Sequence, residues 1–334
     1  MITRTVPLRQ TPRWQLELAQ AVSDPAELLQ HLQLDPALLP AARRAAQLFP
    51  LRVPQAYWRR MVPGDSGDPL LRQVLPLDAE LQAAPGYGTD PVGDAAAMAA
   101  PGVLHKYAGR VLLTATGACA VHCRYCFRRH FPYEEAHAAA AHWQAALDYI
   151  RADTSIVEVI LSGGDPLSLS DRRLQEFVVQ LDEIAHVRRL RVHTRVPVVI
   201  PARVDSSLCA WLRATRLATV VVLHVNHANE IDPAVAAAFA ALAAAGARLF
   251  NQSVLLRGVN DDVATLAALS ERLFAVGVTP YYLHVLDKVA GAAHFAVAPA
   301  QAQALHRGLT ARLPGYLVPR LVREDAGAPA KTWL

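Results

Sequence analysis

Short runs of β-branched and other apolar residues recur along the last two thirds of the chain. They begin near Arg110, Val157, Leu190, Thr219, Arg248 and Thr279. Amphipathic helical patterns lie between them, over 134–151, 171–184, 204–214, 233–245 and 261–276. Strands that alternate with helices in this way are typical of βαβ units around a buried parallel sheet. Six such units predict an α/β fold, either a partial (β/α)6 barrel or a doubly wound sheet.

The first 100 residues show a different pattern. Helical patterns over 25–32 and 41–48 are interrupted by prolines, and Asp24 and Pro25 suit an N-cap and a first helical position. Residues 63–94 are rich in Pro, Gly and Asp, a composition typical of loops. We therefore expect a helical accessory segment and linker over 1–100, followed by a barrel core over 101–334.

Chemically active residue types follow the predicted strands. Ligands bind at the carboxyl ends of the strands in parallel α/β folds, so these residues are expected to share one site. The groups that follow the first four strands are Cys119, Cys123 and Cys126, then Ser162 to Asp165, then Arg195, then His224, Asn226 and His227.

The composition fits a globular protein and narrows its setting. The chain has 334 residues, of which 53% are hydrophobic, and this excludes a disordered protein. The formal net charge of +4 includes no run of five basic residues, so it gives little support to a nucleic-acid partner. No secretory signal is apparent, and the apolar stretch over 233–246 is too short to cross a bilayer. We expect a cytoplasmic protein without a membrane partner.

Three of the four cysteines, Cys119, Cys123 and Cys126, lie within eight positions. In a reducing compartment such clustered thiols indicate metal binding or catalysis. Three thiolates can hold three irons of a [4Fe-4S] cluster and leave the fourth iron open. A zinc site completed by His122 or His130 is the alternative, although no second ligand pair of zinc spacing follows. The fourth cysteine, Cys209, lies in an amphipathic helical pattern, where we expect a buried apolar side chain.

The C-x3-C-x2-C spacing, with Tyr125 before the last cysteine, resembles the motif of the radical S-adenosylmethionine (SAM) superfamily. The resemblance implies a partial (β/α)6 barrel with a [4Fe-4S] cluster and SAM, which together produce a 5'-deoxyadenosyl radical. It also implies that Gly163, Gly164 and Asp165 bind SAM, together with Tyr125 and His224. Glycines let the backbone approach a ligand, and a carboxylate can accept from the SAM ammonium.

Several further motifs resemble the lysine 2,3-aminomutase family. They are LHKYAGR (104–110), CRYCFRR (123–129), LSGGDPL (161–167), HTRVPVVIPAR (193–203), HVNHANE (224–230) and AKT (330–332). The resemblance covers about residues 95–334. It implies an isomerase that also uses pyridoxal 5'-phosphate (PLP) to move the amino group of L-lysine from Cα to Cβ. A glutamate-type aminomutase and a non-enzymatic zinc or iron–sulfur nucleic-acid-binding protein are the alternatives.

The same resemblance assigns the residues around PLP. Lys331 matches the Schiff-base lysine of the family. Lys106, Tyr107 and Arg110 match positions that hold the phosphate, and Gln252 matches another position on the cofactor side. The family commonly has arginine where this chain has Lys106, and a lysine offers a point charge without the bidentate fork.

The substrate residues follow in the same way. Arg128 matches the partner of the substrate carboxylate. Asp287 and Glu324 match the partners of the distal ammonium, which needs carboxylates in a closed site. Glu324 stands where the free-lysine enzymes have Asp, and His284 stands where they have Tyr.

The remaining expectations concern charges and partners. Arg124 and Arg129 are interpreted as surface or cluster-tuning charges. The sequence ends just after Lys331, and this resembles the bacterial branch that makes (R)-β-lysine for the modification of elongation factor P. That branch implies L-lysine, an electron donor, elongation factor P and its lysyl ligase as partners. A free-lysine enzyme of catabolism or secondary metabolism is the alternative.

Overall fold

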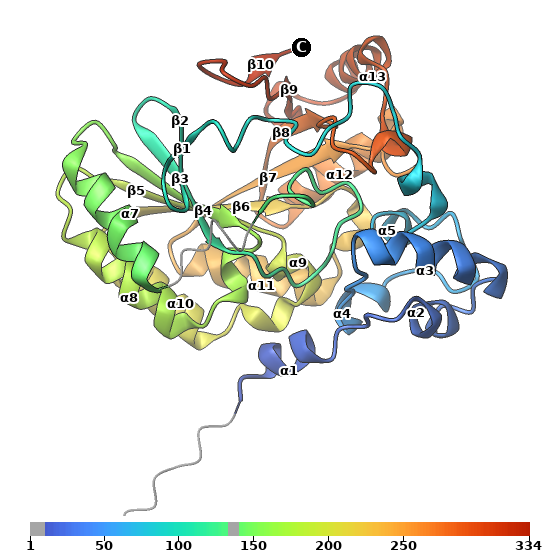
Figure 1. The fold of residues 1–334 in the computed structure, drawn as a ribbon, viewed down its shortest axis with the longest axis horizontal. Coiled ribbons are helices and arrows are strands. Elements are labelled where there is room, and N and C mark those ends of the chain that lie inside the picture. The colour runs from blue at the N-terminus through green and yellow to red at the C-terminus, as the bar shows by residue number, and fades with distance from the viewer. Residues whose placement is uncertain (1–10, 133–139) are drawn as a thin grey trace, which may run out of the picture.

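The computed structural model describes residues 11–132 and 140–334. The six predicted strands are all present, each parallel to the next. They are β3 (Arg110–Thr116), β4 (Glu158–Gly163), β5 (Arg189–Thr194), β6 (Ala218–His224), β7 (Arg248–Leu255) and β8 (Thr279–Val285). Their order in the sheet follows the chain, whereas a doubly wound sheet reverses its order (Figure 1). The partial (β/α)6 barrel is therefore confirmed.

The strands form because both of their faces are covered. In β4, the five residues from Glu158 to Ser162 are all buried. Such continuous burial is typical of parallel strands with a packed barrel interior on one side and helices on the other. The helices are α7 (Ala140–Ala152), α8 (Asp171–Asp182), α9 (Val196–Val199), α10 (Ser206–Ala214), α11 (Pro233–Ala244), α12 (Val263–Ala275) and α13 (Pro299–Arg312). Figure 1 shows α7, α8, α10 and α11 along the outer side of the sheet.

The predicted helices are present with small shifts of their ends. Asp205, Asp232 and Asp262 cap α10, α11 and α12 by accepting a backbone N–H of the first turn. The start of the helix predicted over 134–151 lies outside the described residues. Cys209 is 6% exposed within α10 and packs in the core, as expected.

Short strands extend the sheet at both edges. On one side, β1 (Met98–Ala100) and β2 (Val103–Tyr107) pair antiparallel beside β3. On the other side, β9 (Arg320–Arg323) continues the parallel set, and β10 (Thr332–Trp333) pairs antiparallel with β9. The sheet thus begins at Met98, slightly before the expected core, and β10 returns Lys331 to the barrel.

The N-terminal segment packs against the barrel rather than standing apart from it. Its helices are α1 (Arg13–Ala19), α2 (Pro25–His31), α3 (Leu39–Leu48), α4 (Gln55–Trp58) and α5 (Pro69–Arg72). Leu28, Tyr57 and Leu70 belong to the same hydrophobic cluster as Leu161 and Val192 of the barrel strands. The loop expected over 63–94 is therefore wrong in part, because α5 is buried there.

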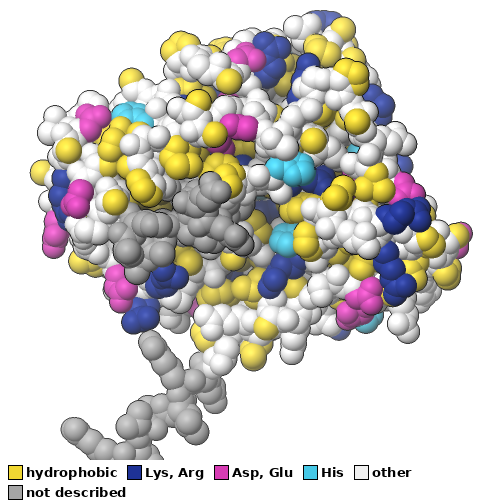
Figure 2. Space-filling view, viewed as in Figure 1, with side chains coloured by type: hydrophobic (Ala, Val, Ile, Leu, Met, Phe, Trp, Pro, Cys, Tyr) yellow, Lys and Arg dark blue, Asp and Glu magenta, His cyan; other side chains and the backbone are white. Residues whose placement is uncertain are grey.

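Single-turn 3-10 helices complete the chain. They are η1 (Pro36–Leu38), η2 (Asp78–Leu81), η3 (Pro166–Ser168), η4 (Pro201–Arg203), η5 (Ala228–Glu230), η6 (Ala293–Phe295) and η7 (Gly315–Leu317). On the face in Figure 2, basic side chains are scattered among acidic and hydrophobic ones. Within residues 11–132 and 140–334, no helix has the length and apolar character needed to cross a membrane.

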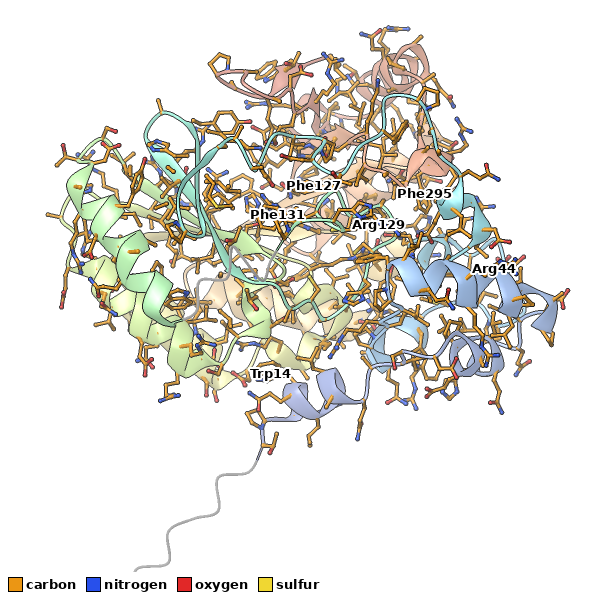
Figure 3. All side chains as sticks on the ribbon, in the orientation of Figure 1. Trp14, Arg44, Phe127, Arg129, Phe131 and Phe295 are labelled. Atoms are coloured by element: carbon orange, nitrogen blue, oxygen red, sulfur yellow. The ribbon has the colours of Figure 1, made fainter. Side chains whose placement is uncertain are left out.

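A buried carboxylate connects the N-terminal segment to the loop after β3 that contains Cys119, Cys123 and Cys126. We call this loop the cysteine loop. Glu80 of η2 accepts from Arg124 Nε and Nη2, at 2.8 and 2.6 Å, and from Arg129 Nη2 at 2.8 Å. Both arginine side chains are at most 1% exposed, and the Phe49 ring lies under both. Figure 3 shows Arg129 and Phe295 beside the N-terminal helices. The interpretation of Arg124 and Arg129 as surface charges is wrong, because both are neutralised inside the protein.

The Glu80→Gln variant tests this tie. Removing the carboxylate leaves two buried guanidinium groups without a counter-charge, and breaking a buried ion pair costs about 3–5 kcal/mol. We expect a loss of this size in the free energy of unfolding, measured with urea. Glu176→Gln is the control, since Glu176 pairs with Arg172 at 3.8 Å on the surface and is expected to contribute little. Equal losses in both variants would contradict the assignment.

Candidate active site

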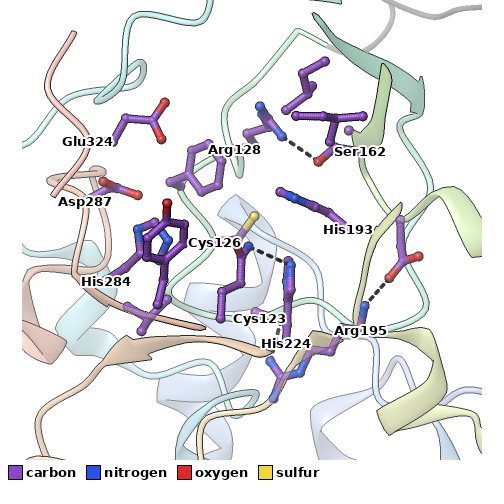
Figure 4. Close-up of a pocket in the computed structure, with 18 of the residues that line it drawn as sticks. Cys123, Cys126, Arg128, Ser162, His193, Arg195, His224, His284, Asp287 and Glu324 are labelled. Carbon is purple, nitrogen blue, oxygen red and sulfur yellow. Dashed lines mark hydrogen bonds between the residues drawn. The ribbon is translucent and has the colours of Figure 1, made fainter. Parts of the chain in front are cut away.

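One cavity of about 480 Å³ lies at the carboxyl ends of the barrel strands (Figure 4). It brings together most of the residues that the sequence singled out for chemistry, although their roles stay predictions; His130 and His227 do not line it. The predicted residues that line it are Lys106, Tyr107, Arg110, Cys119, Cys123, Tyr125, Cys126, Arg128, Gly163, Gly164, Asp165, His224, Gln252, Asp287, Glu324 and Lys331. The carboxyl ends of the parallel strands bring the cysteines, Gly163 to Asp165 and His224 together, whereas Lys106 and Tyr107 come from β2 and Arg110 from the start of β3.

The three cysteines follow β3 and are free thiols that line the cavity. Burial and the neighbouring Cys126 raise the pKa of Cys119 well above its usual value, and burial and Cys123 raise the pKa of Cys126 to about 11. These mutual effects mean that the thiols are near one another in a site that disfavours uncompensated thiolates. Bound irons would supply the missing positive charge. In the described part of the chain, no three His, Cys, Asp or Glu side chains group closely enough for a single metal ion.

Gly163 and Gly164 support the start of the cysteine loop. The N–H of Gly164 donates to Thr116 O at 2.6 Å, and the N–H of Asp165 donates to Ala118 O at 2.8 Å. A Cβ at Gly164 would lie 2.4 Å from Ala118 O, so any side chain there would push the loop away. The glycines therefore allow a close approach of β4 to the segment that leads into Cys119.

Asp165 is bonded to four protein donors. Its Oδ1 accepts from Thr194 Oγ1 at 2.7 Å and from Leu167 N at 3.0 Å. Its Oδ2 accepts from Arg195 N at 2.6 Å and from Val196 N at 3.1 Å. A carboxylate offers about four lone-pair positions, so protein donors occupy all of them. In this structure Asp165 joins the ends of β4 and β5, and the expectation that it accepts from the SAM ammonium stays a prediction.

Five side chains of alternating charge cross the cavity. Asp94 contacts Arg128 Nε and Lys106 Nζ, each at 2.7 Å. Glu324 contacts the same Lys106 Nζ at 3.1 Å and Lys331 Nζ at 2.5 Å. Lys106, which the resemblance places beside a phosphate, is thus held between two carboxylates. We call this set, in the order Arg128, Asp94, Lys106, Glu324 and Lys331, the charge chain.

Asp94 is the site residue that sequence reasoning missed. It lies in the segment interpreted as linker and is 1% exposed. Burial alone would raise its pKa, but Arg128 and Lys106 lower it. Its only sequence signal was an acidic residue just before β1 in a run of small residues, which gives no indication of burial.

The two carboxylates expected to hold an ammonium lie side by side in Figure 4 and have opposite electrostatics. Burial acts to raise the pKa of Glu324, but Lys331 and Lys106 lower it to about 2. Burial and the charge of Glu324 raise the pKa of Asp287 to about 7. A further cation between them would favour the charged form of Asp287. Near neutral pH, Glu324 is therefore charged and Asp287 is partly protonated.

Further cations and imidazoles line the cavity. Arg110 stacks on the Tyr107 ring at 4.8 Å, and Arg320 stacks on the Trp333 ring at 4.9 Å. Cations at this position suit a phosphate dianion. Gln252 Nε2 lies 2.8 Å from His224 Nε2, and burial lowers the pKa of His224 to about 3, so its ring is neutral.

Four buried nitrogens of residues that line the cavity have no protein partner in the structure's described residues. They are Arg129 Nε and Arg195 Nε, and the imidazole atoms His193 Nε2 and His284 Nε2. Buried polar groups are normally hydrogen-bonded, so these atoms indicate that the cavity accommodates a polar ligand. His284 comes from β8, where the family resemblance places a residue near PLP. Both observations fit a cofactor site in this cavity.

No family model matches the chain. The chain is 49% identical over 333 residues to an L-lysine 2,3-aminomutase of Escherichia coli K12, which covers 99% of this chain and 96% of that protein. It is also 49% identical to an L-lysine 2,3-aminomutase of Haemophilus influenzae, over 97% of this chain and 96% of that protein. The chain belongs to the L-lysine 2,3-aminomutase family. It is therefore an isomerase, and the resemblance drawn from its motifs is confirmed.

More distant members of the L-lysine 2,3-aminomutase family match as well. The enzyme of Clostridium subterminale is 33% identical over 96% of this chain and 77% of that protein. Among solved structures, a radical SAM methyltransferase from Sphaerobacter thermophilus has a TM-score of 0.46 and 18% identity, over 66% of this chain and 68% of that chain.

The Asp287→Asn variant tests the buried carboxyl pair in cofactor-free protein. Folding raises the pKa of Asp287 to about 7 from about 4 in the unfolded chain. The folded protein then binds more protons than the unfolded chain across this window, so its stability falls as the pH rises towards 7. Between pH 5 and pH 8 we expect the natural protein to lose about 2–3 kcal/mol relative to the variant, measured by urea unfolding.

Asp65→Asn, at an exposed loop position, controls for the loss of a carboxylate. This variant is expected to follow the natural protein at each pH. A stability difference between Asp287→Asn and the natural protein that does not change with pH would show that Asp287 is not held neutral by folding.

Proposed function

We propose that this chain converts L-lysine to β-lysine with a [4Fe-4S] cluster, SAM and PLP. The observation that carries the proposal is a single cavity in which three cysteine thiols lie opposite a lysine paired with a carboxylate. The curated relatives at 49% identity are L-lysine 2,3-aminomutases, and they match nearly the whole chain. The charge of the cavity fits a substrate with a carboxylate at one end and an ammonium at the other.

Cys119, Cys123 and Cys126 would hold three irons of the cluster. When bound and reduced by an external electron donor, the cluster and SAM supply a 5'-deoxyadenosyl radical that removes a hydrogen atom from the substrate. The protein keeps this chemistry enclosed, because the cysteine loop is fixed by Glu80 through Arg124 and Arg129. Gly163, Gly164, Tyr125 and His224 line the cavity near the loop and are our candidates for SAM contacts.

Lys331 would carry PLP, with Arg110, Tyr107 and Gln252 along the cofactor. PLP supplies the imine chemistry that lets the amino nitrogen move between neighbouring carbons. Lys106 lines the same cavity and would contribute a positive charge, although the two carboxylates of the charge chain hold it in the cofactor-free protein. We therefore assign Lys106 two sets of partners: the PLP phosphate, and the carboxylates of Asp94 and Glu324.

Arg128 would bind the substrate carboxylate, and Asp287 with Glu324 would bind its distal ammonium. Glu324 holds the Lys331 ammonium at 2.5 Å before substrate is present. Once Lys331 carries PLP, its amine would no longer offer an ammonium to Glu324, and the substrate ammonium would take that place. Glu324 and Asp287 would then face the substrate ammonium together.

Turnover tests the proposal directly. Protein reconstituted without oxygen with iron, sulfide, PLP, SAM and a reductant should form β-lysine from L-lysine. Lys331→Ala should lose at least 100-fold in turnover, on the order of what the loss of a positioned general acid or base costs, and should retain the visible absorbance of the cluster. Lys288→Ala, at an exposed lysine next to Asp287, should keep its activity. Failure of cluster-loaded natural protein to form β-lysine would contradict the function.

The scarcity of lysine makes a second readout possible. The chain has only three lysines, Lys106, Lys288 and Lys331, and two of them line the cavity. Borohydride reduction of PLP-loaded protein fixes the cofactor to the lysine that carries it. Peptide mapping should find the label on Lys331, and a label on Lys106 would overturn this assignment while leaving the fold and cavity unaffected.

We further propose that the product serves the modification of elongation factor P, with attachment by a separate lysyl ligase. The support is that the chain departs from the free-lysine enzymes at two cavity residues, Glu324 and His284, which stand where those enzymes have Asp and Tyr. The oxygen-sensitive thiols suit a reducing cytoplasm.

Deletion of the gene tests the pathway. Elongation factor P from the deletion strain should lack the added mass of β-lysine, and free β-lysine in the medium should restore it. A factor that keeps its modification in the deletion strain would favour a free-lysine enzyme of catabolism or secondary metabolism.

A further inference from the structure

We propose that Arg195 is a positioning residue that raises the reduction potential of the cluster through Cys123, and that the N-terminal segment holds Arg195 in place. This inference rests on the proposed function, because it requires a cluster on the cysteine loop. It gives the N-terminal segment a part in the redox chemistry.

The guanidinium of Arg195 contacts the cysteine loop on one side. Arg195 lies at the end of β5 and is 4% exposed. Its Nη1 donates to Cys123 Sγ at 2.8 Å and to Tyr125 Oη. Its backbone N–H donates to Asp165 Oδ2, a contact drawn in Figure 4. The backbone and the side chain are thus both fixed beside a cluster ligand.

The other side of the guanidinium meets Glu230 and the N-terminal segment. Its Nη2 donates to Glu230 Oε2 at 2.9 Å, to Gln73 Oε1 at 2.7 Å and to Tyr57 Oη at 3.0 Å. Tyr57 lies in α4, and Gln73 directly follows α5. Two residues from a segment about 120 to 140 positions away therefore determine where this arginine sits.

Gln73 and Glu230, which contact Arg195, are fixed by hydrogen bonds of their own. Gln73 and Glu230 are both 0% exposed, and Gln73 Nε2 donates to Glu230 Oε1 at 3.2 Å and to Pro69 O at 3.0 Å. Glu230 Oε1 also accepts the backbone N–H of Asn226 at 2.8 Å. Rotation of Arg195 away from Cys123 would break several buried hydrogen bonds at once, so the N–H of Arg195 stays directed at the sulfur.

A fixed cation with an N–H on a ligand sulfur stabilises the reduced cluster, because reduction adds negative charge. Arg195 therefore shifts the potential of the cluster to a more positive value. Glu230 lies on the far side of the same guanidinium and offsets part of its field. The two residues thus act on the cluster with opposite signs, which a merely structural role would not produce.

The test is an EPR-monitored redox titration of the full chain, reconstituted with iron and sulfide and without lysine or PLP. Arg195→Gln should shift the midpoint potential to a more negative value. Glu230→Gln should shift it to a more positive value. Tyr57→Phe should give a smaller negative shift than Arg195→Gln, because one support of the guanidinium is lost.

Arg203→Gln is the matched control. Arg203 is 0% exposed and is held by Asp171 at 2.8 Å and by Leu167 O at 2.8 Å, away from the cysteine loop. This variant should lower the thermal unfolding midpoint and leave the potential unchanged.

Each result decides one question. If the natural protein holds a cluster and all variants have the same midpoint potential as it, the inference about Arg195 is wrong. The proposed function would be unaffected by that result. Failure of the natural protein to assemble a [4Fe-4S] cluster would instead contradict the proposed function. If Arg195→Gln does not fold, the sign of the Glu230→Gln shift decides, since a negative shift or none would overturn the inference.

Discussion

The cationic side chains of this protein can lie inside it only because buried carboxylates neutralise them. An unpaired charge is costly in a low-dielectric interior, so each guanidinium or ammonium near the cavity needs a fixed partner. Glu80 forms ion pairs with Arg124 and Arg129, and Asp94 forms them with Arg128 and Lys106. Glu230 pairs with Arg195. These carboxylates fix the positions of the groups that would meet the cofactors and the substrate.

These carboxylates lie far along the chain from their partners. Glu80 and Asp94 belong to the segment before the barrel core, while the arginines they bind belong to the cysteine loop. The N-terminal segment and the barrel are therefore coupled through charges as well as through their shared apolar core. This coupling gives a physical reason for the N-terminal helices to pack against the barrel.

The sequence predicted those parts of the molecule whose signal is local. Six apolar runs at intervals of about 30 residues indicated the barrel, in line with the usual size of a βαβ unit. The spacing of the cysteines indicated their shared loop, and the motif around Lys331 placed it in the site. Each of these features depends on residues that are close together in the chain.

The features that the sequence did not predict depend on contacts between distant segments of the chain. Asp94 and Gln73 lie in stretches with little periodicity, so nothing in their surroundings distinguished them from loop residues. The position of Asp165 was predicted, but its hydrogen bonds with Thr194 and Val196 of the next βα unit were not. Arg124 and Arg129 looked like surface charges until Glu80 was seen beside them. Short strands such as β10, with two residues, carry too few positions for a pattern.

The pairing of β10 with β9 has a consequence for motion. The ladder between β10 and β9 has two residue pairs, Thr332 with Arg323 and Trp333 with Val322, and the hairpin lies at the edge of the sheet. Such an edge opens with a lower free energy than the barrel beneath it, so its amide protons should exchange first. Glu324 and Lys331 lie seven positions apart within the same hairpin, so one local opening event would carry both out of the cavity together. A ligand that bridges this hairpin to the barrel would therefore close the site and order the end of the chain in a single step.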